Sequence, residues 1–286
     1  MSTVRIVTDS ACDLSDEEIA SYEVAVVPLS IRFGEQEYVD RQDLTAHQFW
    51  AKVAASPMLP ETAAPSPGAF EQAFRSAAHD GASGVVCIVL SSKLSATYGS
   101  AQLGAKAVAD VIDVRVVDSL SITSGLGTMC IVAARRAQGG ASLDEVEIAA
   151  RALVGRTRVY GGLDTLDNLK KGGRIGGAQA LIGSLLSIRP IIDISTGEVE
   201  QVGKQRTRAK VFAQLLLQLT TAQAEHGAVE NVAVMHGDAN DIEDFLQLLS
   251  ANYPRRDIRV GQIGAVIGTH GGPGVMGLTF NLPVSS

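Results

Sequence analysis

The sequence predicts an α/β protein with an N-terminal domain built on a parallel sheet and a C-terminal α/β domain with a mixed or antiparallel sheet. Three apolar runs, at residues 4–9, 85–90 and 114–118, are each followed by small polar residues and then by a helical pattern. Val/Ile runs that alternate with helices are typical of parallel strands buried on both faces. In the second half, two strand-like runs flank the turn at Thr196 and Gly197, which indicates a hairpin.

The chain length favours two domains. With 286 residues the chain exceeds the size at which a single core usually keeps growing. The pattern changes near residues 155–165, where a strand-like run (158–162) precedes a short helical one (166–171). We therefore expect domains at residues 1–160 and 161–286, with a long helix at about 207–226 and a small-molecule site in the cleft between the domains.

Composition and charge exclude several classes of protein. A net charge of -7 argues against nucleic acid as a partner, because phosphate affinity requires clustered Lys and Arg. No uninterrupted apolar run is long enough for a transmembrane segment, and the N-terminus leads directly into a strand pattern. We expect a cytoplasmic protein, with transient membrane contact as the one kind of membrane association.

The cysteines and histidines do not indicate a metal site. Cys12, Cys87 and Cys130 are far apart, two of them lie in apolar runs, and all three are interpreted as small buried hydrophobic residues. The five histidines never occur at a spacing typical of zinc ligands. The sequence therefore predicts neither a metal nor a cofactor.

The most informative segment is residues 267–277, IGTHGGPGVMG, where His270 lies among glycines. Glycine in a packed element costs conformational entropy and buries no side chain, so this run suggests the close approach of backbone amides to a ligand. The alternative is a glycine-rich turn that serves only the fold.

Two loops before helical patterns offer hydroxyl groups. Thr62 precedes Ser66 and Pro67, which fit a helix cap and the first helical position, so capping explains Ser66 but not Thr62. Segment 91–98, SSKLSATY, offers four serine and threonine hydroxyls where a strand end joins a helix, and a helix start favours anions.

Arg174 lies beside a glycine turn in LKKGGRI, and arginine suits forked recognition of a carboxylate or a phosphate. The structural alternative is an ion pair between Arg174 and an aspartate across the domain boundary.

Six segments together carry a family resemblance. VTDSACDLS, TxxPSP, SSKLSATY, VVDSLSITSG, LDNLKKGGRI and IGTHGGPGVMG occur in this order over nearly the whole chain. The chain thereby resembles the DegV family of bacterial fatty-acid-binding proteins. The resemblance implies a two-domain α/β fold that buries one long-chain fatty acid, such as palmitate, in a tunnel.

The resemblance also implies the site residues. The carboxylate contacts are expected from Thr62 and Ser95, with Arg174 and His270 nearby as the charged outer part of the same network. Two positions depart from the family pattern, because Ala63 stands where a serine is common and Ala96 where a glycine is common. These departures could reshape the head-group pocket or shift the acyl-chain preference.

Binding of a fatty acid is physically consistent with a chain rich in aliphatic side chains. Burial of about 15 methylenes at about 0.8 kcal/mol each gives on the order of 12 kcal/mol before ordering costs. An unpaired carboxylate in such surroundings is penalised, so donors must converge on it. Segment 182–188 is a candidate for part of the tunnel wall, with ordinary core as the equal alternative.

The resemblance further implies a partner, a fatty acid kinase to which the carrier presents its lipid. A basic cluster at Lys204, Arg206, Arg208 and Lys210 is a candidate docking patch in an acidic protein, and a solvated helix start is the alternative.

Two other functions stay open. A triad of Ser95, His270 and an aspartate would make the protein an acyl hydrolase, and a regulatory module would bind no ligand. The G-x-G-x-x-G match at residues 272–277 does not indicate a dinucleotide site, because only nine residues follow it.

Overall fold

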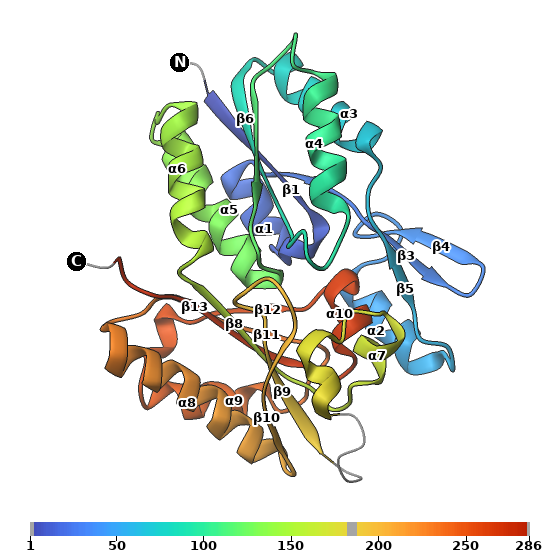
Figure 1. Ribbon diagram of the computed structural model, residues 1–286, viewed down its shortest axis with the longest axis vertical. Helices are drawn as coiled ribbons and strands as arrows, with labels where there is room; N and C mark the ends of the chain where they lie inside the picture. Colours follow the sequence, from blue (N-terminus) through green and yellow to red (C-terminus); the bar gives the residue numbers. More distant parts are fainter. Residues whose placement is uncertain (1–2, 182–187, 285–286) are drawn as a thin grey trace.

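In the computed structural model, which describes residues 3–181 and 188–284, the chain forms three sheets (Figure 1). The first is fully parallel and has the order β2-β1-β6-β7. Its strands are β1 (Thr3–Asp9), β2 (Ala25–Val27), β6 (Ala82–Val89) and β7 (Val114–Asp118). Three of these coincide with the predicted apolar runs, so the parallel α/β prediction is confirmed for this half.

Helices cover both faces of the parallel sheet (Figure 1). On one face lie α3 (Pro67–His79) and α4 (Thr97–Ala107), and on the other α5 (Thr123–Gln138) and α6 (Leu143–Val154). Ser66 accepts a hydrogen bond from the amide of Ala69 at the start of α3, with Pro67 at its first position, as predicted. The remaining helical elements of this half are η1 (Ser10–Cys12), α1 (Asp16–Tyr22) and α2 (Ala46–Ala55).

The second sheet is mixed, with the order β10-β9-β8-β13-β11-β12 and one parallel pair, β11 with β12. Its strands are β8 (Thr157–Gly162), β9 (Arg189–Asp193), β10 (Glu200–Gln205), β11 (Glu230–His236), β12 (Arg259–Gln262) and β13 (Met276–Asn281). The predicted hairpin is confirmed as the antiparallel pair of β9 and β10. Because β8 belongs to this sheet, a boundary at residue 160 falls inside a strand, and the division into two domains stays a prediction.

One face of the mixed sheet packs against α8 (Arg208–His226) and α9 (Ile242–Ser250), and the other faces the parallel-sheet half. Short elements complete this half: α7 (Asp167–Lys171), η2 (Gly176–Leu181), η3 (Arg255–Asp257) and α10 (Ala265–Gly271). No helix in the described part of the chain is long and apolar enough to cross a membrane.

A third, antiparallel sheet has the order β4-β3-β5 and was not predicted. It consists of β3 (Ser30–Phe33), β4 (Gln36–Val39) and β5 (Glu61–Ala63). The sequence instead indicates a proline-rich loop around residues 58–68. The difference arises because β5 has only three residues between prolines and pairs with β3 on one side alone, so it lacks a strand-length apolar pattern.

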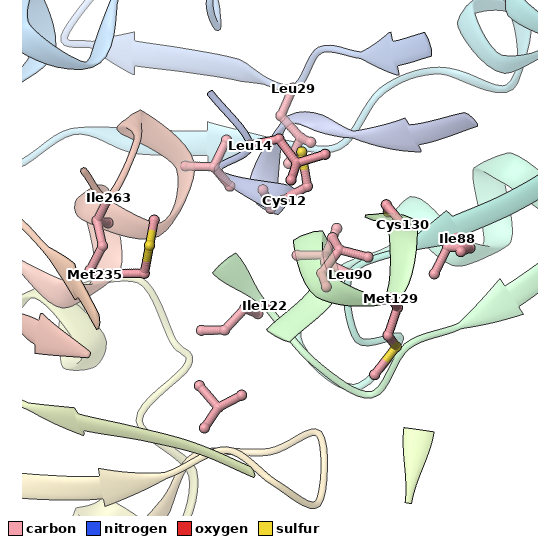
Figure 2. Packing of buried hydrophobic residues seen from close by; sticks show 14 of the residues in the cluster. Cys12, Leu14, Leu29, Ile88, Leu90, Ile122, Met129, Cys130, Met235 and Ile263 are labelled. Atoms are coloured by element: carbon pink, nitrogen blue, oxygen red, sulfur yellow. The ribbon is translucent and has the colours of Figure 1, made fainter. Parts of the chain in front are cut away.

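A continuous apolar core joins the two large sheets. Met235 and Ile263 from the mixed-sheet half belong to the same buried cluster as Leu14, Leu90 and Ile122 from the parallel-sheet half, and Figure 2 shows them in one region. These side chains are all nearly inaccessible to solvent. The two halves therefore pack as one unit around the region where the parallel strands end.

The polar ends of the parallel strands hold each other in place. Asp9, fully buried, accepts hydrogen bonds from the amides of Ala11 and Leu90 at 2.9 and 2.7 Å. Asp118 accepts one from the amide of Ser92 at 3.1 Å. Burial raises the pKa of Asp9 to about 7 despite these bonds. These aspartates position the loops that carry the site.

Substitution of Gly162 tests the packing of α8 on the mixed sheet. A Cβ atom at this position would lie 2.3 Å from Val211 Cγ1 in the buried face of α8. We predict that Gly162→Ala lowers the free energy of unfolding by about 1–3 kcal/mol through overpacking. Gly203→Ala is the matched control, because a Cβ there meets nothing within 4 Å. Equal denaturation midpoints for the two variants would contradict this packing.

Candidate functional site

A cavity of about 200 Å³ lies between the ends of the parallel strands, the face of the mixed sheet, and α10. All four residues predicted for the site, Thr62, Ser95, Arg174 and His270, line this one cavity. They come from positions up to 208 residues apart in the chain. The structure therefore brings the predicted set together at one place.

Thr62 and His270 are in direct contact. Thr62 lies on β5, opposite Ile31 of β3, and its Oγ1 is 3.0 Å from Nε2 of His270 in the last turn of α10. Which atom donates depends on the tautomer of the ring. The contact places a hydroxyl and an imidazole side by side in the cavity wall.

The position of α10 is fixed at both ends. At its start, Oδ1 of Asp13 accepts a hydrogen bond from the amide of Gly264 at 3.0 Å. In its last turn, Nδ2 of Asn168 donates to the carbonyl of Thr269 at 2.9 Å. Asn168 lies in the LDNLKKGG segment, but its function could not be predicted from the sequence, since nothing in that segment shows that α7 contacts α10.

His270 is neutral near pH 7. Burial, followed by the nearby charge of Arg174, lowers its pKa to about 4. Its Nδ1 is buried and has no hydrogen-bond partner in the described part of the chain. Gly172 packs against this nitrogen so closely that a Cβ there would lie 2.4 Å from it. The ring is thus a neutral hydrogen-bonding group held in a tight slot.

Arg174 supplies a positive charge to the same wall. Its Nε donates to the carbonyl of Leu94 at 3.2 Å, and its Nη1 donates to the carbonyl of Gly172. Within residues 3–181 and 188–284, no carboxylate forms an ion pair with Arg174, so the proposed pairing with an aspartate is absent there. The half-buried guanidinium is oriented by two carbonyls.

The hydroxyls of segment 91–98 divide into separate functions. Ser91 Oγ donates to the carbonyl of Gly197 at 2.6 Å and so ties the two halves together. Ser95 Oγ lies 2.8 Å from Oγ1 of Thr97 and accepts from the Thr97 amide at 3.3 Å, at the start of α4. Ser95 lines the cavity and Ser91 does not, although sequence alone does not distinguish them.

Part of the glycine run serves the fold, which is the alternative that the sequence left open. The amides of Gly268, Gly272 and Gly274 donate to carbonyls of the protein itself, so the expectation that such amides face a ligand is wrong for these three. Gly268 is needed for packing, because a Cβ there would lie 2.7 Å from both Phe49 and Trp50 of α2. Gly271, by contrast, lines the cavity.

The rest of the cavity wall is mainly aliphatic. From the parallel-sheet half come Leu29, Leu90, Leu94 and Ile122. From the mixed-sheet half and α10 come Val159, Leu163, Leu169, Ile192, Ile194, Val199, Ile263, Val266, Ile267 and Val275. The wall candidate at 182–188 lies, apart from residue 188, outside the described residues.

A polar hollow of about 410 Å³ adjoins the cavity. The two share Leu94, Ser95, Ala96, Arg174 and Val199. The residues that only the hollow contacts are Ser92, Lys93, Gly173, Gly176 and Glu198. The cavity therefore has a polar compartment beside the wall that carries Ser95 and Arg174.

Of the two departures from the family pattern, Ala96 lines the cavity and Ala63 does not. Ala96 begins α4 with φ −71° and ψ −1°, a conformation that any residue adopts, so its methyl group costs no backbone strain. Ala63 is exposed and absent from the cavity wall, whereas Thr62 and Ala64 line it. A hydroxyl at position 63 is therefore not part of this wall.

The hydrolase triad is not assembled in the described residues. Ser95 Oγ contacts Thr97 and His270 Nε2 contacts Thr62, whereas Nδ1 of His270 has no carboxylate partner there. Nor does this part of the chain contain a group of three or more His, Cys, Asp or Glu side chains arranged to hold a metal ion.

Comparison with known proteins decides the family. The profile described as an uncharacterised protein of the DegV family matches residues 3–282. The chain belongs to the DegV family. A DegV domain-containing protein of Streptomyces coelicolor is 35% identical over 280 residues, covering 97% of this chain and 98% of that one.

Solved DegV structures share the fold. A fatty-acid-binding DegV family protein of Thermus thermophilus has a TM-score of 0.88 at 31% identity, covering 98% of this chain and all of that one. DegV of Bacillus subtilis, a fatty acid binding protein, has a TM-score of 0.87 at 28% identity, covering 99% and 100%. A stearic-acid-binding protein of Eubacterium ventriosum has a TM-score of 0.88 at 28% identity, covering 98% of each chain.

The titration of His270 tests the electrostatics of this DegV site. We predict a midpoint near pH 4 by NMR, and Arg174→Gln should raise it while leaving it below 6.5, because burial is the larger cause. Since the folded pKa is below the unfolded value, protonation favours the unfolded chain. The contribution of His270 to stability is therefore complete above pH 6.5 and is lost as pH falls toward 4. A midpoint at 6.5 or above would contradict the buried neutral ring.

Proposed function

We propose that this protein binds one long-chain fatty acid, such as palmitate, with its carboxylate at Thr62, Ser95, Arg174 and His270. The observation that carries the proposal is that these four side chains line one cavity whose remaining wall is mainly aliphatic. The tail supplies most of the affinity through burial of methylenes. The fatty-acid-binding relatives with the same fold support this ligand class.

The head-group end combines one charge with neutral donors. Arg174 offsets the carboxylate charge, and a charge-assisted hydrogen bond is stronger than a neutral one. Thr62 donates its hydroxyl hydrogen to the carboxylate when His270 does not accept it. Neutral His270 donates or accepts according to its tautomer without adding a second charge.

Extraction of the purified protein with organic solvent, followed by mass spectrometry, tests the ligand class. We expect a fatty acid at about one per chain. Thr62→Val and Arg174→Gln should each weaken palmitate binding to delipidated protein by roughly 10- to 100-fold, the effect of losing one bond to a charged group. Thr221→Val, on the exposed face of α8, is the matched control and should leave binding unchanged. Absence of lipid together with no measurable palmitate binding would reject the proposal.

We further propose that the protein presents its lipid to a fatty acid kinase in the cytoplasm and does not itself transform it. The polar hollow supports this because it gives a partner enzyme access to the wall that carries Ser95 and Arg174. Strand β10 begins just after Glu198 and Val199 of the hollow and leads to Lys204 and Arg206, about 15–25 Å away. The three cysteines are free and buried, as is usual in a reducing compartment.

One of the four residues in the candidate docking patch is already bonded within the protein. Arg208 donates to both carboxylate oxygens of Asp241, at 2.7 and 3.0 Å, and is therefore unsuited to a partner. Lys204, Arg206 and Lys210 are exposed. The patch we propose consists of these three residues.

Charge reversal tests the patch. Lys204→Glu with Arg206→Glu should reduce kinase-dependent acyl phosphate formation at least about tenfold at low salt, because complementary charge governs encounter. Lipid content should stay at the wild-type value. Arg255→Glu with Arg256→Glu, on exposed η3, is the control pair. Turnover equal to that of the control pair would reject the patch.

A further inference from the structure

Two glycines on neighbouring strands of the mixed sheet lie opposite each other in the cavity wall. Gly161 of β8 and Gly277 of β13 are direct partners in the antiparallel register. Both line the cavity. Paired residues on neighbouring strands lie about 4.5–5.5 Å apart, so the two positions form one bare patch of sheet.

Neither glycine is required by the fold itself. Neither has a left-handed backbone. A Cβ at Gly277 would meet its nearest atom, the carbonyl oxygen of Met235, at an ordinary 3.5 Å. A Cβ at Gly161 would meet only the side chain of Ile192, at 3.3 Å. By contrast, packing requires glycine at positions 162 and 268, because a Cβ atom at either one would lie less than 3 Å from a neighbouring side chain.

A glycine pair in the middle of a sheet lowers the stability of the fold. Glycine in a strand interior loses conformational entropy and contributes no side chain to packing. At positions 161 and 277 the space that side chains would fill belongs to the cavity. Side chains at these two positions would occupy part of the cavity. Glycine leaves that part open.

The pair lies beyond the head-group end. Val275 packs beside Gly271, the neighbour of His270, since a Cβ at Gly271 would lie 3.3 Å from Val275 Cγ2. Gly277 follows Val275 by two residues along the chain, which is about 7 Å in a strand. An extended chain advances about 1.2 Å per bond, so about six bonds of an acyl tail cover this distance.

We infer that Gly161 and Gly277 set the acyl-chain length that the protein accepts, by leaving a trough in the sheet for the part of the tail beyond the head-group end. The inference rests on the proposed function and extends it to chain selection. Filling the trough leaves the head-group contacts in place and excludes the distal methylenes. The result is a protein with a weaker preference for palmitate over shorter acids.

Binding of octanoate and palmitate to delipidated protein tests the inference. Each methylene kept out of the cavity corresponds to about fourfold in affinity. Gly277→Ala should lower the palmitate-to-octanoate affinity ratio about fivefold, and Gly277→Val about fiftyfold. Gly161→Ala should resemble Gly277→Ala, because only the flexible Ile192 side chain has to move.

The controls separate this inference from the proposed function. Gly203→Val, in β10 and outside the cavity, should keep the wild-type ratio. Wild-type protein that binds neither acid would overturn the proposed function. Wild-type protein that binds palmitate, together with an unchanged ratio in Gly277→Ala and Gly161→Ala, would overturn the chain-length inference alone. Gly277→Ala adds one methyl group without a close contact, so the test does not depend on the larger variant folding.

Discussion

The site depends on how α10 is held between the sheets. This seven-residue helix is bonded at its start to Asp13 of the parallel-sheet half, near its end to Asn168, and through His270 to Thr62 of the small sheet. Gly268 lets it approach Phe49 and Trp50 of α2 more closely than any other residue would allow. These contacts place the imidazole of His270 in the cavity wall.

Charge and apolarity are separated within the cavity. The half-buried Arg174 brings the positive charge, and burial together with that charge keeps His270 neutral. A second cation so close would repel the first, so a neutral ring is the arrangement that this geometry favours. The rest of the cavity wall is mainly aliphatic and includes Gly161 and Gly277.

Sequence patterns predicted the large elements because burial imposes them. Valine and isoleucine runs gave β1, β6 and β7, and the Ser66-Pro67 cap gave the start of α3. Strand β5 was not predicted because its three residues are too few to show the alternation of apolar and polar side chains that identifies a strand. Arg208 was grouped with its basic neighbours because its partner, Asp241, is 33 residues away.

The site residues were predicted through family resemblance and not from spacing. Nothing local tells Ser95 from Ser91, or shows that Gly268 serves packing while Gly161 and Gly277 line the cavity. Those distinctions depend on which surface each residue meets after folding. Tertiary contacts alone supply that information.

A crystal structure of the protein with palmitate would test the central claim most directly. The account predicts the carboxylate within hydrogen-bond distance of Thr62 Oγ1 and the Arg174 guanidinium, with the tail crossing Gly161 and Gly277. A carboxylate at another surface, or a tail that avoids the face of the mixed sheet, would contradict it.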